Sequence, residues 1–164
     1  MEAYGKFHAI SFALRDQEPE LLRKLAENTV EQVFNRRDIP VERSKQHMSM
    51  QHKKILDCLN GDEDAAAIEK YKKYIEDDVD IMRGVFDNVN EYCVIGHGDS
   101  WVNNMLFKYE NASHPDRPTK VSLLDWQLSR YGSPALDLSY FIFTCTDHAL
   151  RAKHYDNMIK FYYH

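Results

Sequence analysis

One short loop and one strand end carry three side chains that together could do chemistry. Residues 94–107 read VIGHGDSWVNNMLF and place Asp99 and Asn104 in a loop between two strand-like runs. A third apolar run ends at Asp125 in the sequence LLDWQ, and functional side chains are common at such positions. The oxygens of Asn104 and Asp125 are hard ligands that suit Mg²⁺ better than Zn²⁺. Asp99 then remains as a base for the proton of an alcohol.

This division of roles is typical of protein kinases, in which H-R-D-x-x-x-x-N is followed by a strand-terminal aspartate. Here the first part is spelled HGDSWVNN over residues 97–104, and the second part begins at Asp125. The loop alone is only moderate evidence for a kinase site, because aspartate and asparagine also occur in turns, where their side chains bind backbone amides. The strand-terminal aspartate in the expected order makes the combination much more specific.

The order of these motifs resembles the phosphotransferases of the choline kinase and aminoglycoside phosphotransferase type, and within them the insect ecdysteroid-kinase-like family. Three segments carry most of the resemblance, namely HGDSWVNN (97–104), LDWQ (124–127) and GSPALDLSY (132–140). The FHA run at residues 7–9 is a further piece, and the resemblance covers essentially the whole chain. It implies a protein-kinase-like fold, binding of ATP and Mg²⁺, and transfer of the γ-phosphoryl group to a hydroxyl of a small molecule.

The resemblance also implies a role for each site residue. Asp99 and Asn104 would be the catalytic residues, with Asp99 as the base that orients the hydroxyl. Asn104 and Asp125 would bind the metal and, through it, the nucleotide. His97 would brace the loop without reacting, and Asp137 would cap its helix or tie down the catalytic loop. In phosphoryl transfer the protein takes little part in covalent chemistry, so positioning and charge stabilisation supply most of the rate enhancement.

Two features depart from the kinase pattern. Trp101 stands where protein kinases often carry a lysine, so another group must meet the charge on the moving phosphoryl. The sequence also holds no GxGxxG and no Val-Ala-Ile-Lys-like strand, and it runs from a helix near Met1 to a helical run at His164. We therefore expect one domain over residues 1–164, a partial kinase C-lobe with the N-lobe absent.

Two other functions stay open at this point. A truncated product without catalysis, acting as a helical binding module or having no activity, agrees with the missing N-lobe. A metal-dependent hydrolase that uses Asp99 and Asp125 agrees with the carboxylates but not with the order of the motifs. The sequence leaves the acceptor open between an ecdysteroid-like and a choline-like alcohol.

The bulk properties agree with an ordinary globular protein. The chain has 164 residues, of which 43% are hydrophobic and 29% charged, and its net charge is −5. An acidic chain argues against a nucleic-acid partner, because binding nucleic acid takes a basic face. The sequence holds no apolar run of about twenty residues, so we expect no membrane partner. No signal peptide is evident. Three scattered cysteines without a CxxC pair favour a cytoplasmic location, and the oligomeric state stays open.

Helices on both sides of a small β insert must position these residues, so we expect an α+β, mainly helical fold. Residues 1–90 read as helices, 91–126 as catalytic and metal-binding loops with short strands, and 127–164 as helices. The expected helices span about residues 4–14, 19–34, 41–59, 62–86, 133–144 and 147–162. The expected strands span 92–95, 105–109 and 120–124, the last two forming a hairpin beside the first. Asp62 is the expected N-cap of the fourth helix.

Several aromatic residues and histidines outside the motifs receive plain structural interpretations. His47 and His52 lie five positions apart, a poor spacing for a shared metal, and are expected in solvent. The lysine-rich segment around Tyr71 is expected on an exposed helix face. Trp101 and Trp126 are expected to pack beside the catalytic loop.

Overall fold

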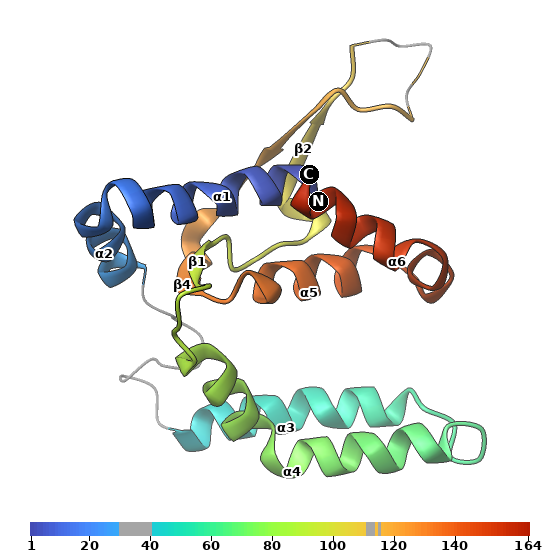
Figure 1. Cartoon of the computed structure of the whole chain (residues 1–164). Coiled ribbons are helices and arrows are strands. Elements are labelled where there is room, and N and C mark those ends of the chain that lie inside the picture. The colour runs from blue at the N-terminus through green and yellow to red at the C-terminus, as the bar shows by residue number, and fades with distance from the viewer. Residues whose placement is uncertain (30–40, 111–113, 115) are drawn as a thin grey trace. The chain divides into compact units, whose positions relative to one another are not determined.

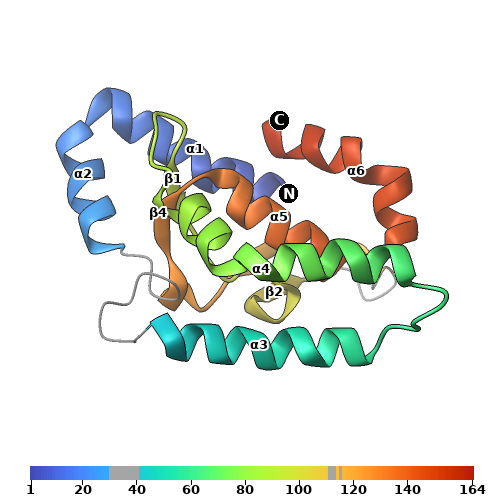
Figure 2. The same ribbon diagram turned by 90° about the horizontal axis from the view of Figure 1, so that it is seen from below.

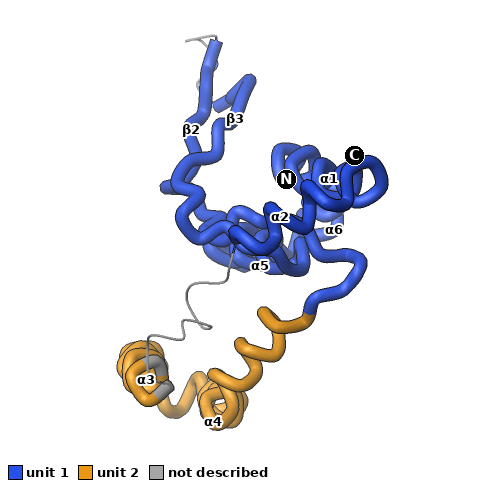
Figure 3. Tube along the Cα trace, turned by 90° about the vertical axis from the view of Figure 1, so that its left-hand side faces the viewer, with its two compact units in different colours: residues 1–31, 89–164 blue, residues 32–88 orange. Residues whose placement is uncertain are grey.

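The computed structural model describes residues 1–29, 41–110, 114 and 116–164. Most of these residues lie in helices, and two small antiparallel sheets hold the β-structure (Figure 1). The predicted α+β, mainly helical class is therefore confirmed. The chain divides into two compact units, Met1–Glu31 with Val89–His164, and Gln32–Asn88 (Figure 3). The motif residues all lie in the first unit.

The helices of the first unit begin where the sequence offers a start signal. They are α1 (Glu2–Gln17), α2 (Pro19–Asn28), α5 (Pro134–Cys145) and α6 (His148–Tyr163). Pro19 opens α2, where its missing N–H would have no helical partner anyway. The Ser133 side chain accepts a hydrogen bond from the Ala135 N–H, and the Asp147 side chain accepts one from the Leu150 N–H, so each caps a helix. The predicted helix residues beyond 29 fall outside the described range.

The strands form two separate pairs. β2 (Met105–Lys108) and β3 (Lys120–Leu123) form the predicted antiparallel hairpin, with Met105 opposite Leu123. β1 (Val94–Gly96) pairs instead with β4 (Arg130–Gly132), a strand that the sequence analysis did not predict. The expectation that the hairpin lies beside the first strand is therefore wrong. A strand of three residues is too short to show a period, so its pairing depends on contacts distant in sequence.

The core of this unit lies between α1, α6 and the hairpin. Tyr4, Met105 and Tyr162 form its buried cluster, and side chains of β3 and α5 pack against it. The N-terminal end of α1 lies beside the C-terminal end of α6 (Figure 1, Figure 2). Gly5 permits this close approach, because a Cβ at this position would lie 2.1 Å from the Tyr162 carbonyl oxygen.

The second unit is a pair of helices, α3 (Val41–Asp57) and α4 (Ala65–Asp87). His52 is buried, its Nε2 lying 2.6 Å from the Asp78 Oδ2 and its Nδ1 2.8 Å from the Tyr71 hydroxyl. The expectation of a solvated His52 is therefore wrong, because these polar groups bind one another between the helices. Lys70, Lys72 and Lys73 are exposed as expected, whereas Tyr71 is half-buried. Asp62 is not the N-cap of α4, since the helix begins at Ala65 and Asp64 occupies the cap position.

Two glycine substitutions test the α1–α6 crossing with opposite expected signs. Gly5→Ala forces the helices apart and lowers the free energy of unfolding by about 1–3 kcal/mol. Gly84→Ala, inside α4 with nothing within 4 Å of the added carbon, raises it by about 0.5–1 kcal/mol. Urea unfolding of both variants measures the difference. Equal effects of the two substitutions would contradict the close helix crossing.

Candidate active site

The loop between β1 and β2 is shaped by one glycine. Gly98 has a φ of +84°, a conformation that favours glycine. A Cβ at this position would lie 1.8 Å from the Leu128 carbonyl oxygen, so any other residue would also collide with the backbone. The loop therefore passes directly against the segment that follows Asp125, and this contact brings the two parts of the motif together.

Asp99 and Asn104 are in direct contact. The Asn104 Nδ2 lies 2.8 Å from the Asp99 Oδ2 and 3.1 Å from the Asp99 carbonyl oxygen. Both side chains are partly buried. The amide nitrogen of Asn104 thus orients the carboxylate of Asp99, and its amide oxygen is the atom that could ligate a cation.

Asp125 is held beside this pair through the backbone of its neighbour. The Leu124 N–H donates to the Asn104 carbonyl oxygen at 2.9 Å, and the Leu124 carbonyl accepts from the His97 Nε2 at 2.8 Å. Asp125 has a φ of 61°, and no other described non-glycine residue has a positive φ. Short polar side chains tolerate this left-handed conformation better than most. Its carboxylate is exposed, two residues beyond the end of β3.

His97 uses both ring nitrogens to hold the loop. Its Nε2 faces a carbonyl oxygen, so Nε2 carries the proton, and its Nδ1 accepts from the Asp99 N–H at 3.2 Å. The ring is buried and packs on Trp126 with 4.5 Å between centroids. Trp126 therefore packs beside the loop as expected. With both nitrogens engaged, His97 is placed to brace the loop.

Asp137 ties the loop to α5. Its carboxylate accepts from the His97 N–H at 2.6 Å and from the Gly98 N–H at 2.8 Å, and it faces the His8 Nε2 at 3.1 Å. Burial alone would raise the pKa of Asp137, but the hydrogen bonds from His8, Gly98 and His97 outweigh it and lower that pKa. The helix cap is supplied by Ser133, so Asp137 is free for the loop.

His8 belongs to this support and was missed as a site residue by the sequence analysis. It is fully buried, and its Nδ1 lies 2.9 Å from the Tyr162 hydroxyl. Burial, followed by the charges of Tyr163 and Asp137, raises the pKa of Tyr162 to about 12. The FHA run marked the position without giving it a role. Since its partners lie at the far end of the sequence, local spacing carries no signal for them.

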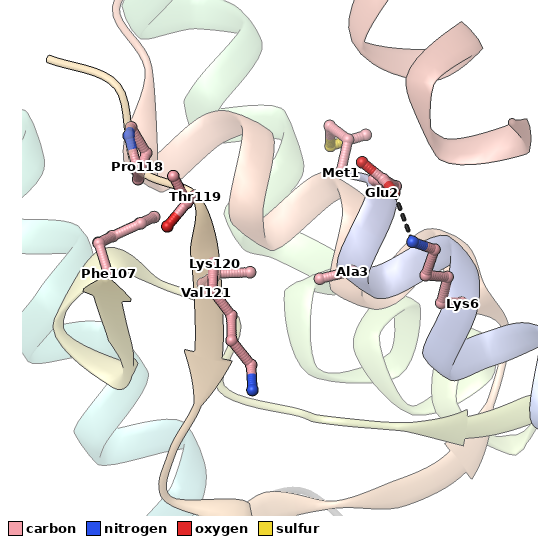
Figure 4. A pocket seen from close by; sticks show the side chains of 9 residues that line it. All are labelled: Met1, Glu2, Ala3, Lys6, Phe107, Pro118, Thr119, Lys120 and Val121. Carbon is pink, nitrogen blue, oxygen red and sulfur yellow. Dashed lines mark hydrogen bonds and ion pairs between the residues drawn. The ribbon is translucent and has the colours of Figure 1, made fainter. Parts of the chain in front are cut away.

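A cavity near this region is a separate feature. It has a volume of about 490 Å³ between the start of α1 and the β2–β3 hairpin (Figure 4). Its lining residues are Met1, Glu2, Ala3, Lys6, Phe107, Pro118, Thr119, Lys120 and Val121. None of Asp99, Asn104 and Asp125 lines it, so it is not part of the candidate active site.

The described residues offer a small donor set for a metal. Among them, no group of three histidine, cysteine or acidic side chains is arranged to hold an ion. Asn104 and Asp125 could supply two hard oxygen ligands, and Mg²⁺ commonly binds through one or two carboxylates together with water and phosphate oxygens. The residues present therefore fit Mg²⁺ bound with a nucleotide better than a metal held by protein alone.

The comparisons with known proteins point to one family. A family model described as the ecdysteroid kinase-like family matches residues 1–164. The 4-hydroxytryptamine kinase of Psilocybe cubensis is 40% identical over 47 residues, which are 29% of this chain and 13% of that protein. Acyl-CoA dehydrogenase family member 11 of Rattus norvegicus is 37% identical over 60 residues, 37% of this chain and 7% of that protein. The matches thus span a small part of these curated relatives.

No solved structure matches the chain. No helix in the described ranges is long and apolar enough to cross a membrane.

Proposed function

The chain belongs to the ecdysteroid kinase-like family, and we propose that it transfers the γ-phosphoryl group of ATP to a hydroxyl of a small molecule. The family match and the relatives named as kinases support a small-molecule phosphotransferase. The observation that carries the proposal is the 2.8 Å contact between Asn104 and Asp99 beside the backbone that leads into Asp125. In this proposal the base is Asp99, and the two oxygen ligands are Asn104 and Asp125.

Asp99 acts as the base in this proposal. The acceptor hydroxyl donates its hydrogen bond to the carboxylate, which orients the oxygen for attack and takes its proton. Asn104 fixes the carboxylate through its amide nitrogen. A positioned base of this kind contributes about 10²- to 10⁴-fold to a rate.

Asn104 and Asp125 would hold Mg²⁺ through their side-chain oxygens. The bound ion would neutralise charge on the phosphates of ATP. His97 and Asp137 support the two proposed ligands. His97 binds the Leu124 carbonyl next to Asp125, and Asp137 binds the amides of the loop. Trp101, two positions after the proposed base, supplies no positive charge.

We assign the unit that carries the motif to the C-lobe part of a protein-kinase-like fold. Both units fall within the family match, which supports treating residues 1–164 as one domain. For the acceptor we propose an ecdysteroid-like or choline-like alcohol. The described cysteines Cys58, Cys93 and Cys145 form no disulfide bond, which supports a cytoplasmic setting.

Phosphorus NMR tests the proposal directly. The protein is incubated with Mg-ATP and, separately, with ecdysone, choline and 4-hydroxytryptamine. At least one of these acceptors should yield a phosphomonoester signal together with ADP. Unchanged ATP with all three acceptors would contradict the proposal. Release of phosphate from a monoester without ATP would favour a metal-dependent hydrolase.

A further inference from the structure

The buried carboxylate of Asp137 binds the loop between β1 and β2 and helix α1 at the same time. Its Oδ1 accepts from the Gly98 N–H at 2.8 Å. Its Oδ2 is shared between the His97 N–H at 2.6 Å and the His8 Nε2 at 3.1 Å. A stronger bond from His8 would draw Oδ2 toward α1, so the state of the His8 ring bears on how firmly the loop is held.

The geometry of His8 fits an uncharged ring. The ring is fully buried and faces Asp137 on α5, Tyr162 on α6 and Tyr4 on its own helix. Hydrogen bonds from charged nitrogens to carboxylates are typically about 2.7–2.9 Å long, whereas the His8 Nε2 lies 3.1 Å from the Asp137 Oδ2. Since Nε2 faces a carboxylate, it carries a proton, and Nδ1 of an uncharged ring is then an acceptor that needs a donor.

Tyr162 supplies this donor from the last turn of α6. Its hydroxyl lies 2.9 Å from the His8 Nδ1, and the two rings meet edge to face with 5.7 Å between centroids. Burial is the first cause that raises the pKa of Tyr162 to about 12, so the phenol keeps its proton near neutral pH and can donate it. The Tyr162 carbonyl lies against Gly5, which holds this turn of α6 close to α1.

We propose that Tyr162 is a positioning residue for phosphoryl transfer, whose hydroxyl occupies the His8 Nδ1, keeps the ring uncharged and so leaves Oδ2 of Asp137 to the loop. The Tyr162 O–H donates to Nδ1, and the Nε2–H donates to Oδ2. The loop amide that Oδ2 holds belongs to His97, whose ring accepts from the Asp99 N–H at 3.2 Å, so a shift of this residue moves the base. The link to phosphoryl transfer rests on the proposed function of Asp99.

Nitrogen-15 NMR of the histidine rings tests the proton positions in the wild-type protein near neutral pH. His8 is assigned as the ring whose signals disappear in His8→Gln. Its Nε2 should give the signal of a protonated nitrogen, and its Nδ1 should give the signal of an unprotonated one. A protonated Nδ1 in the wild-type protein would overturn the proposal, and this result needs no change at Tyr162.

Tyr162→Phe removes the hydroxyl and keeps the ring. With its donor gone, Nδ1 should bind a second proton from solvent, because the Asp137 carboxylate attracts positive charge, and the two His8 nitrogen signals should move toward one another. Deuterium exchange at the His97 amide should become about threefold to tenfold faster, the effect of one weakened hydrogen bond. Unchanged His8 signals in the folded variant would overturn the proposal.

Tyr163→Phe is the matched control. Tyr163 follows Tyr162 on the same helical turn, but its side chain is 79% exposed. The control should leave the His8 signals and the exchange of the His97 amide as they are in wild type. The same changes in both variants would mean that any disturbance of the last turn of α6 produces them, which would overturn a specific role of the Tyr162 hydroxyl.

Steady-state kinetics measures the consequence for the reaction, with the acceptor that the wild-type protein phosphorylates. In Tyr162→Phe, kcat should fall by about threefold to tenfold, because the base is less well placed. The KM for Mg-ATP should stay within about twofold of wild type, since the proposed metal ligands are unchanged. A wild-type kcat in Tyr162→Phe would overturn the positioning role.

A double substitution tests whether Tyr162 acts through His8. His8→Gln keeps an amide donor for Asp137 and an oxygen acceptor for Tyr162, but glutamine cannot gain a proton. In this background Tyr162→Phe should change amide exchange and kcat by less than about twofold, because residues that act through one another are not additive. Equal effects of Tyr162→Phe in both backgrounds would overturn the proposal.

The measurements separate the possible failures. A wild-type protein that phosphorylates no alcohol contradicts the proposed function and leaves the contact between Tyr162 and His8 to be judged by itself. The ring signals and the amide exchange need no substrate, so they decide in that case whether the Tyr162 hydroxyl sets the state of His8.

Discussion

Asp99→Asn lowers kcat for phosphoryl transfer by about 10²- to 10⁴-fold. Asparagine has the shape of aspartate and can still accept the hydrogen bond from Asn104 through its amide oxygen. It lacks the negative charge and the proton affinity that orient and deprotonate an acceptor hydroxyl. The KM for Mg-ATP should change little, because the proposed metal ligands are Asn104 and Asp125.

The control for this substitution is Asp16→Asn, an exposed aspartate on α1 that takes no part in the site. It should keep wild-type kcat, and both variants should unfold at the same urea concentration as wild type. Discontinuous measurement of ADP and phosphomonoester gives kcat for all three proteins. A kcat for Asp99→Asn within about threefold of wild type, in a folded protein, would remove Asp99 as the base.

Asp137→Asn lowers the free energy of unfolding by about 3–5 kcal/mol, the usual cost of leaving the hydrogen-bond donors of a buried carboxylate without it. The carboxylate accepts from two loop amides and faces the His8 Nε2. An asparagine has one accepting oxygen, so its NH₂ group must face at least one of these donors. The loop between β1 and β2 then loses its hydrogen bonds to the carboxylate on α5.

The same carboxylate gives the stability a defined pH dependence. Because the folded-state pKa of Asp137 is lowered, its contribution is present above the unfolded value of about 3.9 and is lost as the pH falls through the folded pKa. Asp137→Asn should abolish this acid-side loss. Asp156→Asn, exposed on α6, is the control and should keep both the stability and the pH profile. Urea unfolding near pH 7 and below pH 4 measures both effects, and a cost below about 1 kcal/mol at Asp137 would contradict its anchoring role.

Local signals in the sequence were enough for much of the fold. Pro19, Ser133 and Asp147 mark helix starts through interactions within one turn, and the structure has helices there. The β2–β3 hairpin follows from two short apolar runs around a proline-rich turn. The residues proposed for catalysis, Asp99 and Asn104, lie five positions apart, so one loop brings them together.

Contacts between segments that are distant in the sequence could not be predicted from local sequence patterns. His8 meets Asp137 across 129 positions, and no period or motif spacing encodes such a pair. His52 looked solvated because a polar helix face predicts solvent, whereas a partner helix supplies Asp78 and buries the pair. Strand β4 needs β1 as its partner, and three residues alone show no strand pattern.

Calorimetric titration of the protein with Mg-ATP tests the central claim most directly, with Asp125→Ala and Asp16→Ala measured beside it. The claim is that the loop and Asp125, two residues beyond β3, form a metal-nucleotide site. Wild type and Asp16→Ala should bind Mg-ATP alike, and Asp125→Ala should bind at least about tenfold more weakly, as expected for a lost metal ligand. Equal affinities of wild type and Asp125→Ala, or no binding by either, would contradict it.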